Sequence, residues 1–298
     1  MVRLVGIVAL CLAALLPTVV VGAVAGSPTA SADAGVQQVG AAPIPDGPAP
    51  AWIVADMDTG QILAGRDQNV PHAPASTIKT LLALVALDEL PLDATVVADE
   101  ADGKVECTCV GIKAGRTYTT RQLLDALLLV SGNDAADTLA HMLGGKGAAV
   151  DKMNAKAVAL GANATHAGSP SGLNGPGIDG ATTPRDLAVI FRAALANPVF
   201  AAITSSPSAS FPGAAGPVTL VNQDEMLGRY PGMLGGKTGF TDVARKTFVG
   251  AAQRDGRRLV IAMMYGLVKE GGPTYWDQAT SLLDWGFAQD RSAGIGAL

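Results

Sequence analysis

Two β-hairpin patterns, one near each end of the chain, constrain the fold more than any other feature of the sequence. Near the amino end, the apolar runs Ala51–Asp56 and Gln61–Ala64 flank the turn sequence Asp58-Thr59-Gly60. Near the carboxyl end, the apolar runs 246–252 and 258–265 flank a second turn. Helix patterns occupy the residues between the two hairpins. This order favours an α+β fold, in which an antiparallel sheet is built from both ends of the chain and a helical part is inserted between them.

Helix patterns in the middle of the chain begin at residues that commonly cap helices. Thr183-Pro184 combines such a cap with a proline at the first helical position. Residues 275–287 predict a final amphipathic helix, residues 163–181 a loop long enough to have a function, and residues 204–217 an irregular stretch. The expected helices of the middle part begin near Ser76, Thr120, Asp134, Val150 and Thr183.

The amino terminus has the pattern of a signal peptide. Arg3 precedes the apolar run 4–24, and Ala30-Ser31-Ala32 matches the A-x-A cleavage pattern. Retention as a membrane anchor is the alternative, because the run is longer than a usual signal core. Pro17 and the cleavage site favour cleavage near Ala32. In either case we expect an extracytoplasmic protein, secreted or associated with the cell wall, which meets a membrane only if the segment is retained.

These patterns divide the chain of 298 residues into four parts. We expect a signal peptide over 1–32, a flexible leader over 33–49, a folded domain over 50–290 and a tail over 291–298. The helical part of the folded domain is expected at about 94–200, inserted into the sheet part.

Composition argues against some classes of partner. The net charge is −5, no long basic run is present, and aromatic residues make up 4% of the chain. A nucleic-acid partner is therefore not expected, since such proteins use basic patches and aromatic stacking platforms. Hydrophobic residues make up 49% of the chain, which suits a globular domain with a generous core, and the length allows one large domain or two.

Two cysteines, Cys107 and Cys109, remain after cleavage of the predicted signal peptide. In an oxidising compartment they form a possible disulfide, which is tight across a single intervening residue. The alternative is a metal-binding pair. His72, His141 and His166 are scattered along the chain, so support for zinc is weak. We expect neither a metal nor a cofactor.

Three short motifs carry the chemistry: Ser76-x-x-Lys79, Ser131-x-Asn133 and Lys237-Thr238-Gly239. Residues three apart on a helix are neighbours on one face, so the Ser76 hydroxyl should lie beside the Lys79 amine. Serine is a poor nucleophile until a base takes its proton, and a neutral lysine is able to do so. Each motif alone is weak, but their combination and order are typical of penicillin-binding proteins and class A β-lactamases.

On these motifs the chain resembles the low-molecular-mass D-alanyl-D-alanine carboxypeptidases, which are serine peptidases related to penicillin-binding proteins. The resemblance covers about residues 48–288. It implies a β-lactamase/transpeptidase-like fold and a hydrolase that removes the terminal D-alanine from peptidoglycan stem pentapeptides through an acyl-enzyme. The implied partners are a stem peptide ending in D-Ala-D-Ala and β-lactam antibiotics as covalent inhibitors.

The resemblance and the chemistry together assign catalytic roles. Ser76 attacks the amide between the last two D-alanines, and Lys79 accepts its proton. Burial and the positive charge of Lys237 should both lower the pKa of Lys79, which keeps part of it neutral. Ser131 is expected to relay a proton to the leaving nitrogen, and Asn133 to hold Lys79 and the substrate amide.

The third motif is expected to bind substrate. Lys237 supplies positive charge, and the Thr238 hydroxyl suits the terminal carboxylate. Gly239 lets an edge strand lie close to an extended peptide. By analogy with the family, the backbone N–H groups of Ser76 and Phe240 would stabilise the oxyanion, and one such donor is typically worth roughly 3–4 kcal/mol.

Two other functions remain as alternatives: a class A-like β-lactamase and a non-catalytic cell-wall binding protein. Class A β-lactamases carry a glutamate that activates water in the long loop, whereas residues 107–224 of this chain contain no glutamate. The second motif is Ser-Gly-Asn rather than Ser-Asp-Asn, which also favours the peptidase. Asp179 would serve as a base only if the loop folded unusually. A pure binding protein would not need both a nucleophile and a base.

One segment departs from the family pattern. The family usually has a glycine near Arg245, in the turn after the third motif, whereas this chain has Arg245-Lys246. The two cations lie near the predicted cleft, and we expect them to point into water rather than toward substrate.

Overall fold

The structure is a computed structural model that describes residues 35–39, 41–106, 108–213, 215–266 and 272–298. The predicted signal peptide, 1–32, lies outside the described residues. Among the described residues, no single helix is long and apolar enough to span a membrane, and only the pair of helices at 184–195 and 198–204, bent by 106°, meets that test together.

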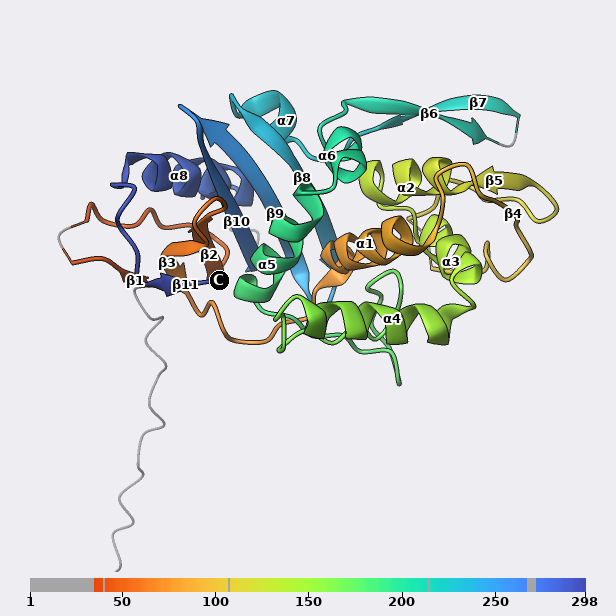
Figure 1. Ribbon diagram of the computed structural model, residues 1–298, viewed down its shortest axis with the longest axis horizontal. Helices are drawn as coiled ribbons and strands as arrows, with labels where there is room; N and C mark the ends of the chain where they lie inside the picture. The colour runs from red at the N-terminus through yellow and green to blue at the C-terminus, as the bar shows by residue number, and fades with distance from the viewer. Residues whose placement is uncertain (1–34, 40, 107, 214, 267–271) are drawn as a thin grey trace, which may run out of the picture. The chain divides into compact units, whose positions relative to one another are not determined.

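The sheet joins strands from both ends of the chain, as the two hairpin patterns predicted (Figure 1). Its order is β1-β3-β2-β10-β9-β8, with β11 also paired to β3, and every pairing is antiparallel. Strand β8, which carries the third motif, lies at the edge. Within the described residues the strands of this sheet are Val36–Gln37 (β1), Ala51–Asp56 (β2), Gln61–Arg66 (β3), Met233–Thr241 (β8), Arg245–Arg254 (β9), Arg257–Gly266 (β10) and Gly296–Ala297 (β11).

A helical part lies between β3 and β8 in the sequence, and it also contains two small two-stranded sheets. One pairs Thr95–Val97 (β4) with Thr117–Thr119 (β5), and the other is a hairpin of Ser208–Gly213 (β6) and Gly216–Val221 (β7). The short helix α7 (Met226–Arg229) precedes β8, and α8 (Tyr275–Ala288) follows β10. The other described helices are a 3₁₀ turn at Ala75–Ile78, Lys79–Glu89 (α1), Thr120–Leu129 (α2), Asn133–Met142 (α3), Lys146–Ala159 (α4), Pro184–Leu195 (α5) and Pro198–Thr204 (α6).

Alternation along β2 separates two apolar cores. Trp52 and Val54 belong to the core that α8 covers, whereas Ile53 and Ala55 belong to the core shared with the helical part. Figure 1 shows α8 on one side of β10 and β9, and α5 and α1 on the other. Because successive strand residues point to opposite faces, a strand buried on both faces must be apolar at every position. The sheet is therefore the middle of three layers.

Two helix starts follow from capping side chains. Thr183 accepts a hydrogen bond from the backbone N–H of Asp186, as its sequence predicted. The cap of α2 is Thr119, one residue before the predicted start at Thr120, and it forms a capping box with Gln122. The difference arises because Thr119 and Thr120 are chemically equivalent caps, and Gln122 lies at the right spacing only for Thr119.

Residues 204–217 are not irregular, and that prediction was wrong. Strands β6 and β7 form a hairpin over most of this segment, and the Phe211 ring stacks on Tyr118 with 5.6 Å between centroids. Pro212 and Pro217 lie opposite one another in the hairpin. Prolines weaken a strand pattern in a sequence but are tolerated in a two-stranded ribbon, where one side of each strand is unpaired.

The predicted leader and tail both take part in the domain. In the leader, β1 pairs with β3, and the carbonyl of Ala42 accepts a hydrogen bond from Trp285 Nε1. Buried Gln278 of α8 bonds to both backbone groups of Ala49. In the tail, β11 pairs with β3. These segments lack a strand pattern because each contributes only two paired residues.

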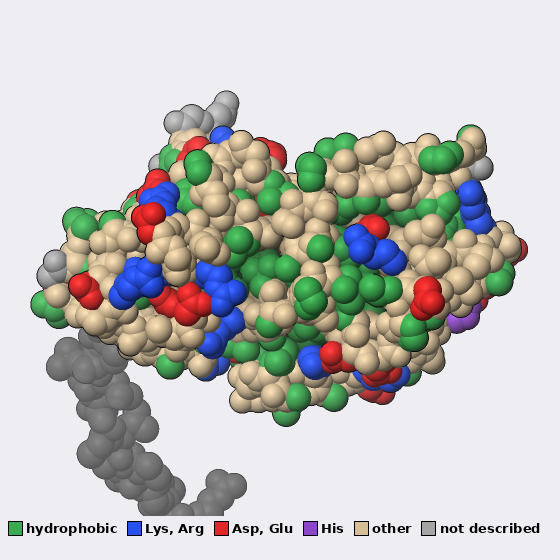
Figure 2. All heavy atoms as spheres, turned by 45° about the horizontal axis from the view of Figure 1, so that its top comes forward, with side chains coloured by type: hydrophobic (Ala, Val, Ile, Leu, Met, Phe, Trp, Pro, Cys, Tyr) green, Lys and Arg blue, Asp and Glu red, His purple; other side chains and the backbone are tan. Residues whose placement is uncertain are grey.

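Charges of both signs are interspersed on the surface. Figure 2 shows one face, on which Lys and Arg side chains lie in small groups next to Asp and Glu. Ion pairs among the described residues include Lys156 with Asp88, whose Nζ and Oδ2 atoms lie 2.7 Å apart.

Candidate active site

Ser76 lies in the 3₁₀ turn that opens α1, next to the edge strand β8. The preceding residue, Ala75, has a positive φ of 47°. Lys79 begins α1, and its Nζ atom lies 2.7 Å from Ser76 Oγ. The predicted pairing of these two side chains is therefore present, although the first turn is 3₁₀ rather than α-helical.

Lys79 is fully buried, and its amine has three oxygen neighbours. Ser76 Oγ, Asn133 Oδ1 and the Ser171 carbonyl oxygen all lie 2.7 Å from Nζ. Burial lowers the pKa of Lys79 well below its usual value, and the positive charge of Lys237 lowers it further. Asp137 and Asp134 oppose this shift. A lysine in such surroundings is suited to act as a base.

Asn133 opens α3, and the backbone around it fixes its orientation. Its Nδ2 donates to the Glu106 carbonyl at 2.6 Å, and its backbone N–H donates to the Thr108 carbonyl at 2.7 Å. Because Nδ2 is engaged in this way, Oδ1 is the atom that faces Lys79. The Ser131-Gly132-Asn133 break between α2 and α3 thus places short polar side chains in the site.

Ser131 and Lys237 form the second polar pair of the site. Ser131 has a positive φ of 62°, and its Oγ accepts a hydrogen bond from Lys237 Nζ at 2.9 Å. Lys237 also donates to the Thr238 carbonyl at 2.7 Å. Burial lowers the pKa of Lys237 to about 7, and the nearby Asp224 carboxylate works against that shift. Lys237 is therefore a buried lysine whose charge depends on its neighbours.

Gly239 is required where β8 meets the turn that carries Ser76. A Cβ atom at this position would lie 2.4 Å from Thr247 Oγ1 and 2.9 Å from the backbone nitrogen of Ser76. Thr247 in turn donates to the Pro74 carbonyl at 3.0 Å, which ties β9 to the same turn. Gly239 thus lets β8 approach the turn that carries Ser76, whereas its predicted approach to an extended peptide stays a prediction.

Two grooves meet at Ser76, Thr108 and Phe240. The first has a volume of about 300 Å³ and is lined by Ser76, Thr108, Ser131, Gln223, Glu225, Thr238, Gly239, Phe240, Lys246, Tyr275 and Trp276. The second, of about 210 Å³, is lined by Ser76, Glu106, Thr108, Asn133, Gly172, Leu173, Phe240, Thr241 and Asp242. Six of the eight predicted site residues line these grooves. The other two, Lys79 and Lys237, lie behind them and act on them through hydrogen bonds.

Residues distant in sequence complete the site. The Ser171 carbonyl belongs to the long loop 163–181, which was expected to have a function from its length alone. Gly172, with a φ of 84°, lets this loop pack on Ala75, because a Cβ there would lie 2.0 Å from the Ala75 carbonyl oxygen. Asp179 of the same loop accepts from the Gly175 N–H and lines neither groove.

Asp224 was not singled out in the sequence. Its side chain is 4% exposed, and burial raises its pKa to about 7. One carboxylate oxygen accepts the Met226 N–H at 3.0 Å, while the other, Oδ2, has no hydrogen-bond partner among the described residues. The Asp224 carboxylate influences Lys237 through its charge. Neither hydrophobic periodicity nor a sequence motif would have indicated this interaction.

The expectation that Arg245 and Lys246 both point into water was wrong for Lys246. Arg245 is exposed and has a positive φ of 55°, which explains why a glycine suits this turn. Lys246 lines the first groove, and its Nζ lies 4.9 Å from the centre of the Tyr275 ring. Tyr275 is the first residue of α8, so sequence proximity gave no sign of this contact.

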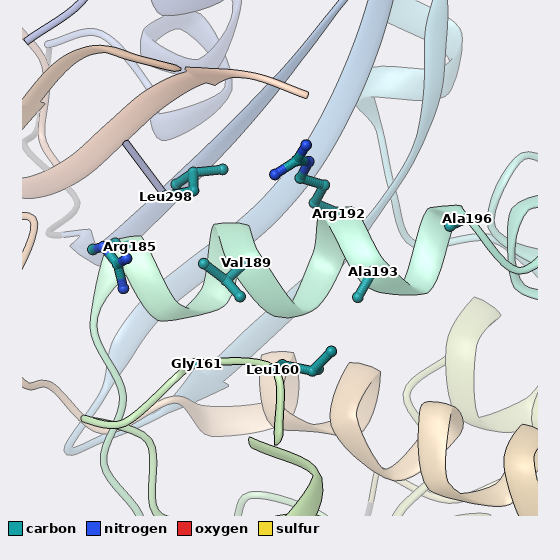
Figure 3. Close-up of a pocket in the computed structure, with 8 residues that line it drawn as sticks. All are labelled: Leu160, Gly161, Arg185, Val189, Arg192, Ala193, Ala196 and Leu298. Atoms are coloured by element: carbon teal, nitrogen blue, oxygen red, sulfur yellow. The ribbon is translucent and has the colours of Figure 1, made fainter. Parts of the chain in front are cut away.

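A third cavity, of about 400 Å³, contains none of the predicted site residues (Figure 3). Helix α5 supplies half of its lining residues, and Arg192 Nε already donates a hydrogen bond to the Met57 carbonyl at 2.6 Å. The lining residues are Leu160, Gly161, Arg185, Val189, Arg192, Ala193, Ala196 and Leu298. We assign it no part in the chemistry at Ser76.

Asp99, Asp102 and His141 are the described side chains that come together with the spacing of metal ligands. The Asp102 carboxylate already accepts the Asp99 N–H at 2.9 Å and is bonded to His141 Nδ1 at 3.1 Å. These bonds account for the cluster without a metal. Cys109 is disulfide-bonded, and its predicted partner, Cys107, lies outside the described residues.

Comparison with known proteins gives consistent matches. Residues 37–266 match the family model described as D-alanyl-D-alanine carboxypeptidase, peptidase S11. A protein of Mycobacterium tuberculosis described as D-alanyl-D-alanine carboxypeptidase DacB2 is 72% identical over 267 residues, which is 90% of this chain and 92% of that protein.

Two solved structures extend the comparison. A crystal structure of a D-alanyl-D-alanine carboxypeptidase from Mycobacterium tuberculosis H37Rv has a TM-score of 0.87 and 71% identity, and the match covers 88% of this chain and 100% of that one. The Streptomyces K15 DD-transpeptidase has a TM-score of 0.76 and 28% identity, and the match covers 83% and 99% of the two chains.

Proposed function

Because this chain belongs to the D-alanyl-D-alanine carboxypeptidase family, peptidase S11, we propose that Ser76 is its nucleophile and Lys79 its general base. The protein is a serine-type D-alanyl-D-alanine carboxypeptidase with a transpeptidase-like fold. Its substrate class is peptidoglycan peptide, and it binds β-lactams. We propose that the specific substrate is a stem pentapeptide ending in D-Ala-D-Ala.

One observation carries the assignment of Lys79 as base: the three oxygen atoms around its amine. The Ser171 carbonyl and Asn133 Oδ1 are acceptors only. A neutral amine has two N–H donors and one lone pair. Directing the two donors at these acceptors leaves the lone pair for the Ser76 hydroxyl proton. This geometry accommodates the neutral, proton-accepting form of Lys79, and burial, which lowers the pKa of Lys79, favours that form.

Acylation proceeds in two steps. Ser76 Oγ attacks the carbonyl carbon of the penultimate D-alanine while its proton passes to Lys79 Nζ. The oxyanion that forms accepts hydrogen bonds from the backbone N–H groups of Ser76 and Phe240. The C–N bond then breaks, and the proton that Lys79 accepted passes through the Ser131 hydroxyl to the leaving nitrogen, which returns Lys79 to its neutral form; Lys237 orients Ser131. D-Alanine leaves, and the shortened peptide remains as an ester of Ser76.

Deacylation reverses the proton path. Water attacks the ester carbon, Lys79 takes a proton from the water, and the C–O bond to Ser76 breaks with return of a proton to Oγ. With penicillin, the leaving nitrogen stays attached to the acyl group. Asp179, the carboxylate considered as a water-activating base, lies outside both grooves. We therefore expect penicillin to form a long-lived adduct.

Intact mass measured over time after addition of benzylpenicillin tests this function. A persistent adduct on the wild type but not on Ser76→Ala, together with D-alanine release from a D-Ala-D-Ala peptide, is the expected result. Rapid hydrolysis of the drug without an adduct would indicate a β-lactamase. If no adduct forms, the drug is not hydrolysed and no D-alanine is released, the remaining hypothesis is a non-catalytic cell-wall binding protein.

We also propose that the enzyme acts outside the cytoplasm, either secreted or associated with the cell wall. The support is the sequence pattern of residues 1–32 and the location of peptidoglycan peptides. Fractionation of cells that produce the full chain, with amino-terminal sequencing of the mature protein, tests cleavage near Ala32. A mature chain that retains residues 1–32 would indicate a membrane anchor.

A further inference from the structure

The first groove, which Ser76 and Thr238 line, contains one cation, Lys246, among its described lining residues. Lys237, the lysine of the third motif, is 1% exposed and is not part of the lining. Its amine is also engaged, by Ser131 Oγ and the Thr238 carbonyl. A negatively charged ligand group in this groove therefore meets Lys246 before it meets Lys237.

Lys246 is held in place without being neutralised. It is the second residue of β9, opposite Phe240 of β8, and its amine lies over the Tyr275 ring. A cation over an aromatic face gains roughly 0.5–1 kcal/mol at an exposed site, which orients the side chain but leaves its charge available. The described residues provide no ion pair to Lys246. Within the described part of the chain, Lys246 is thus an oriented cation without an ion-pair partner.

The carboxylate in the same groove, Glu225, has a cation of its own. Arg229 NH1 lies 3.6 Å from Glu225 Oε2, one helical turn away. Arg229 also approaches Asp277, at 3.8 Å. Glu225 therefore has a cationic neighbour other than Lys246, and Lys246 is the positively charged residue among the described lining of the groove.

The proposed reaction brings an anion into the first groove. The terminal carboxylate of a D-Ala-D-Ala peptide lies one residue beyond the carbonyl that Ser76 attacks, which is at most about 3.6 Å of chain. Ser76 and Thr238 line the same groove as Lys246. Given the proposed function, on which this inference rests, we propose that Lys246 binds the terminal carboxylate of the substrate together with the Thr238 hydroxyl. Lys246 then makes the enzyme selective for peptides with a free carboxyl end.

Arg245 offers a matched control for this role. It is the neighbouring cation in the chain, but it is exposed and lines neither groove. Replacing either residue by methionine removes one positive charge from the same short segment. If the effect is only general electrostatics, both variants should lose affinity for the free acid. If Lys246 contacts the carboxylate, only Lys246→Met should lose it.

The test compares wild type, Lys246→Met, Lys246→Arg and Arg245→Met on two peptides that end in D-Ala-D-Ala, one with a free carboxylate and one with a carboxyl-terminal amide. For Lys246→Met we expect KM for the free acid to rise about 10- to 100-fold, because a charge-assisted hydrogen bond is lost. Its kcat/KM for the amide should stay within about twofold of wild type. Lys246→Arg should restore most of the affinity, and Arg245→Met should match wild type.

Equal losses on both peptides in Lys246→Met, or no loss on the acid, would overturn the proposal. Melting temperatures of all variants separate a folding defect from a binding defect, and Lys246→Arg tests the charge in a folded protein. Failure of the proposed function itself has a different signature, since wild type would then release no D-alanine from the free acid.

Discussion

The Nζ atom of Lys79 lies 2.7 Å from the Oγ atom of Ser76, in a pocket where the lysine is fully buried. Burial disfavours the ammonium form, so the amine beside the proposed nucleophile is placed to take a proton rather than to supply charge. The second lysine, Lys237, is close enough to reinforce this effect. Two buried lysines with separate tasks are the central feature of the site.

Replacing Lys79 by arginine tests the need for a neutral base. Arginine keeps the positive charge and cannot be deprotonated at ordinary pH. We expect acylation by a fluorescent penicillin to fall by about 10²- to 10⁴-fold in both Lys79→Arg and Lys79→Met. A Lys79→Arg variant that acylates within tenfold of wild type would show that charge, not basicity, is the contribution of Lys79.

Replacing Gly239 by alanine should damage the site more than the fold. The new Cβ would meet Thr247 Oγ1 and the Ser76 nitrogen, so β8 must move away from the nucleophile. A displacement near 1 Å lowers the acylation rate by about 100-fold. Gly147→Ala, in α4, is the control, because nothing lies within 4 Å of its Cβ position. Similar acylation rates in both variants would contradict the close approach described here.

Asp224→Asn tests electrostatic support of Lys237 by pH dependence. The charged groups around Asp224 are Lys237 of β8, the adjacent Glu225, and Tyr275 of α8, whose pKa is raised. The Asp224 carboxylate raises the pKa of Lys237, so its removal lowers that pKa. The alkaline limb of the acylation profile should therefore move to lower pH, with a loss of about three- to tenfold at pH 8 and little at pH 5.5. Acylation profiles of wild type and Asp224→Asn that have the same dependence on pH would contradict electrostatic support of Lys237 by Asp224.

The same variant should be more stable at alkaline pH. The folded-state pKa of Asp224, about 7, lies above the usual aspartate value of 3.8, so ionisation opposes folding. This penalty is absent below pH 3.8, grows as the pH rises toward 7, and is complete above 7. We expect the gain in melting temperature of Asp224→Asn to be larger at pH 8 than at pH 5. A gain independent of pH would point to packing instead.

Arg245→Gly should stabilise the domain slightly. Arg245 has a φ of 55°, a region that costs a residue with a side chain about 1 kcal/mol and costs glycine little. An increase of about 1 kcal/mol in the free energy of unfolding corresponds to about 2–4 °C in melting temperature for a domain of this size. Arg245→Ala keeps the strained backbone and should show no such gain. Equal melting temperatures for the glycine and alanine variants would exclude strain at this position.

The fold class and the edge position of the third motif were predictable from the sequence. Strand patterns at both ends of the chain require a sheet built from both ends, and a glycine after Lys237-Thr238 suits a strand that approaches another backbone. The cap at Thr183 was also predictable, because capping depends on residues within one turn. The β6–β7 hairpin was missed because its prolines weaken the strand pattern. Strands β1 and β11 were missed because two paired residues are too few to form a recognisable strand pattern.

By itself, the sequence determined roughly where each predicted site residue lies on its own element, and from these residues it predicted the chemistry. Ser76 and Lys79 are three residues apart, and that spacing makes them neighbours in any helical turn. Tertiary structure decided what surrounds them. The Ser171 carbonyl and Asn133 reach Lys79 across 92 and 54 residues of chain, and Tyr275 orients Lys246 from a different helix. Local spacing specifies contacts within an element, whereas the burial and charge that set the pKa of Lys79 exist only once distant elements have packed around it.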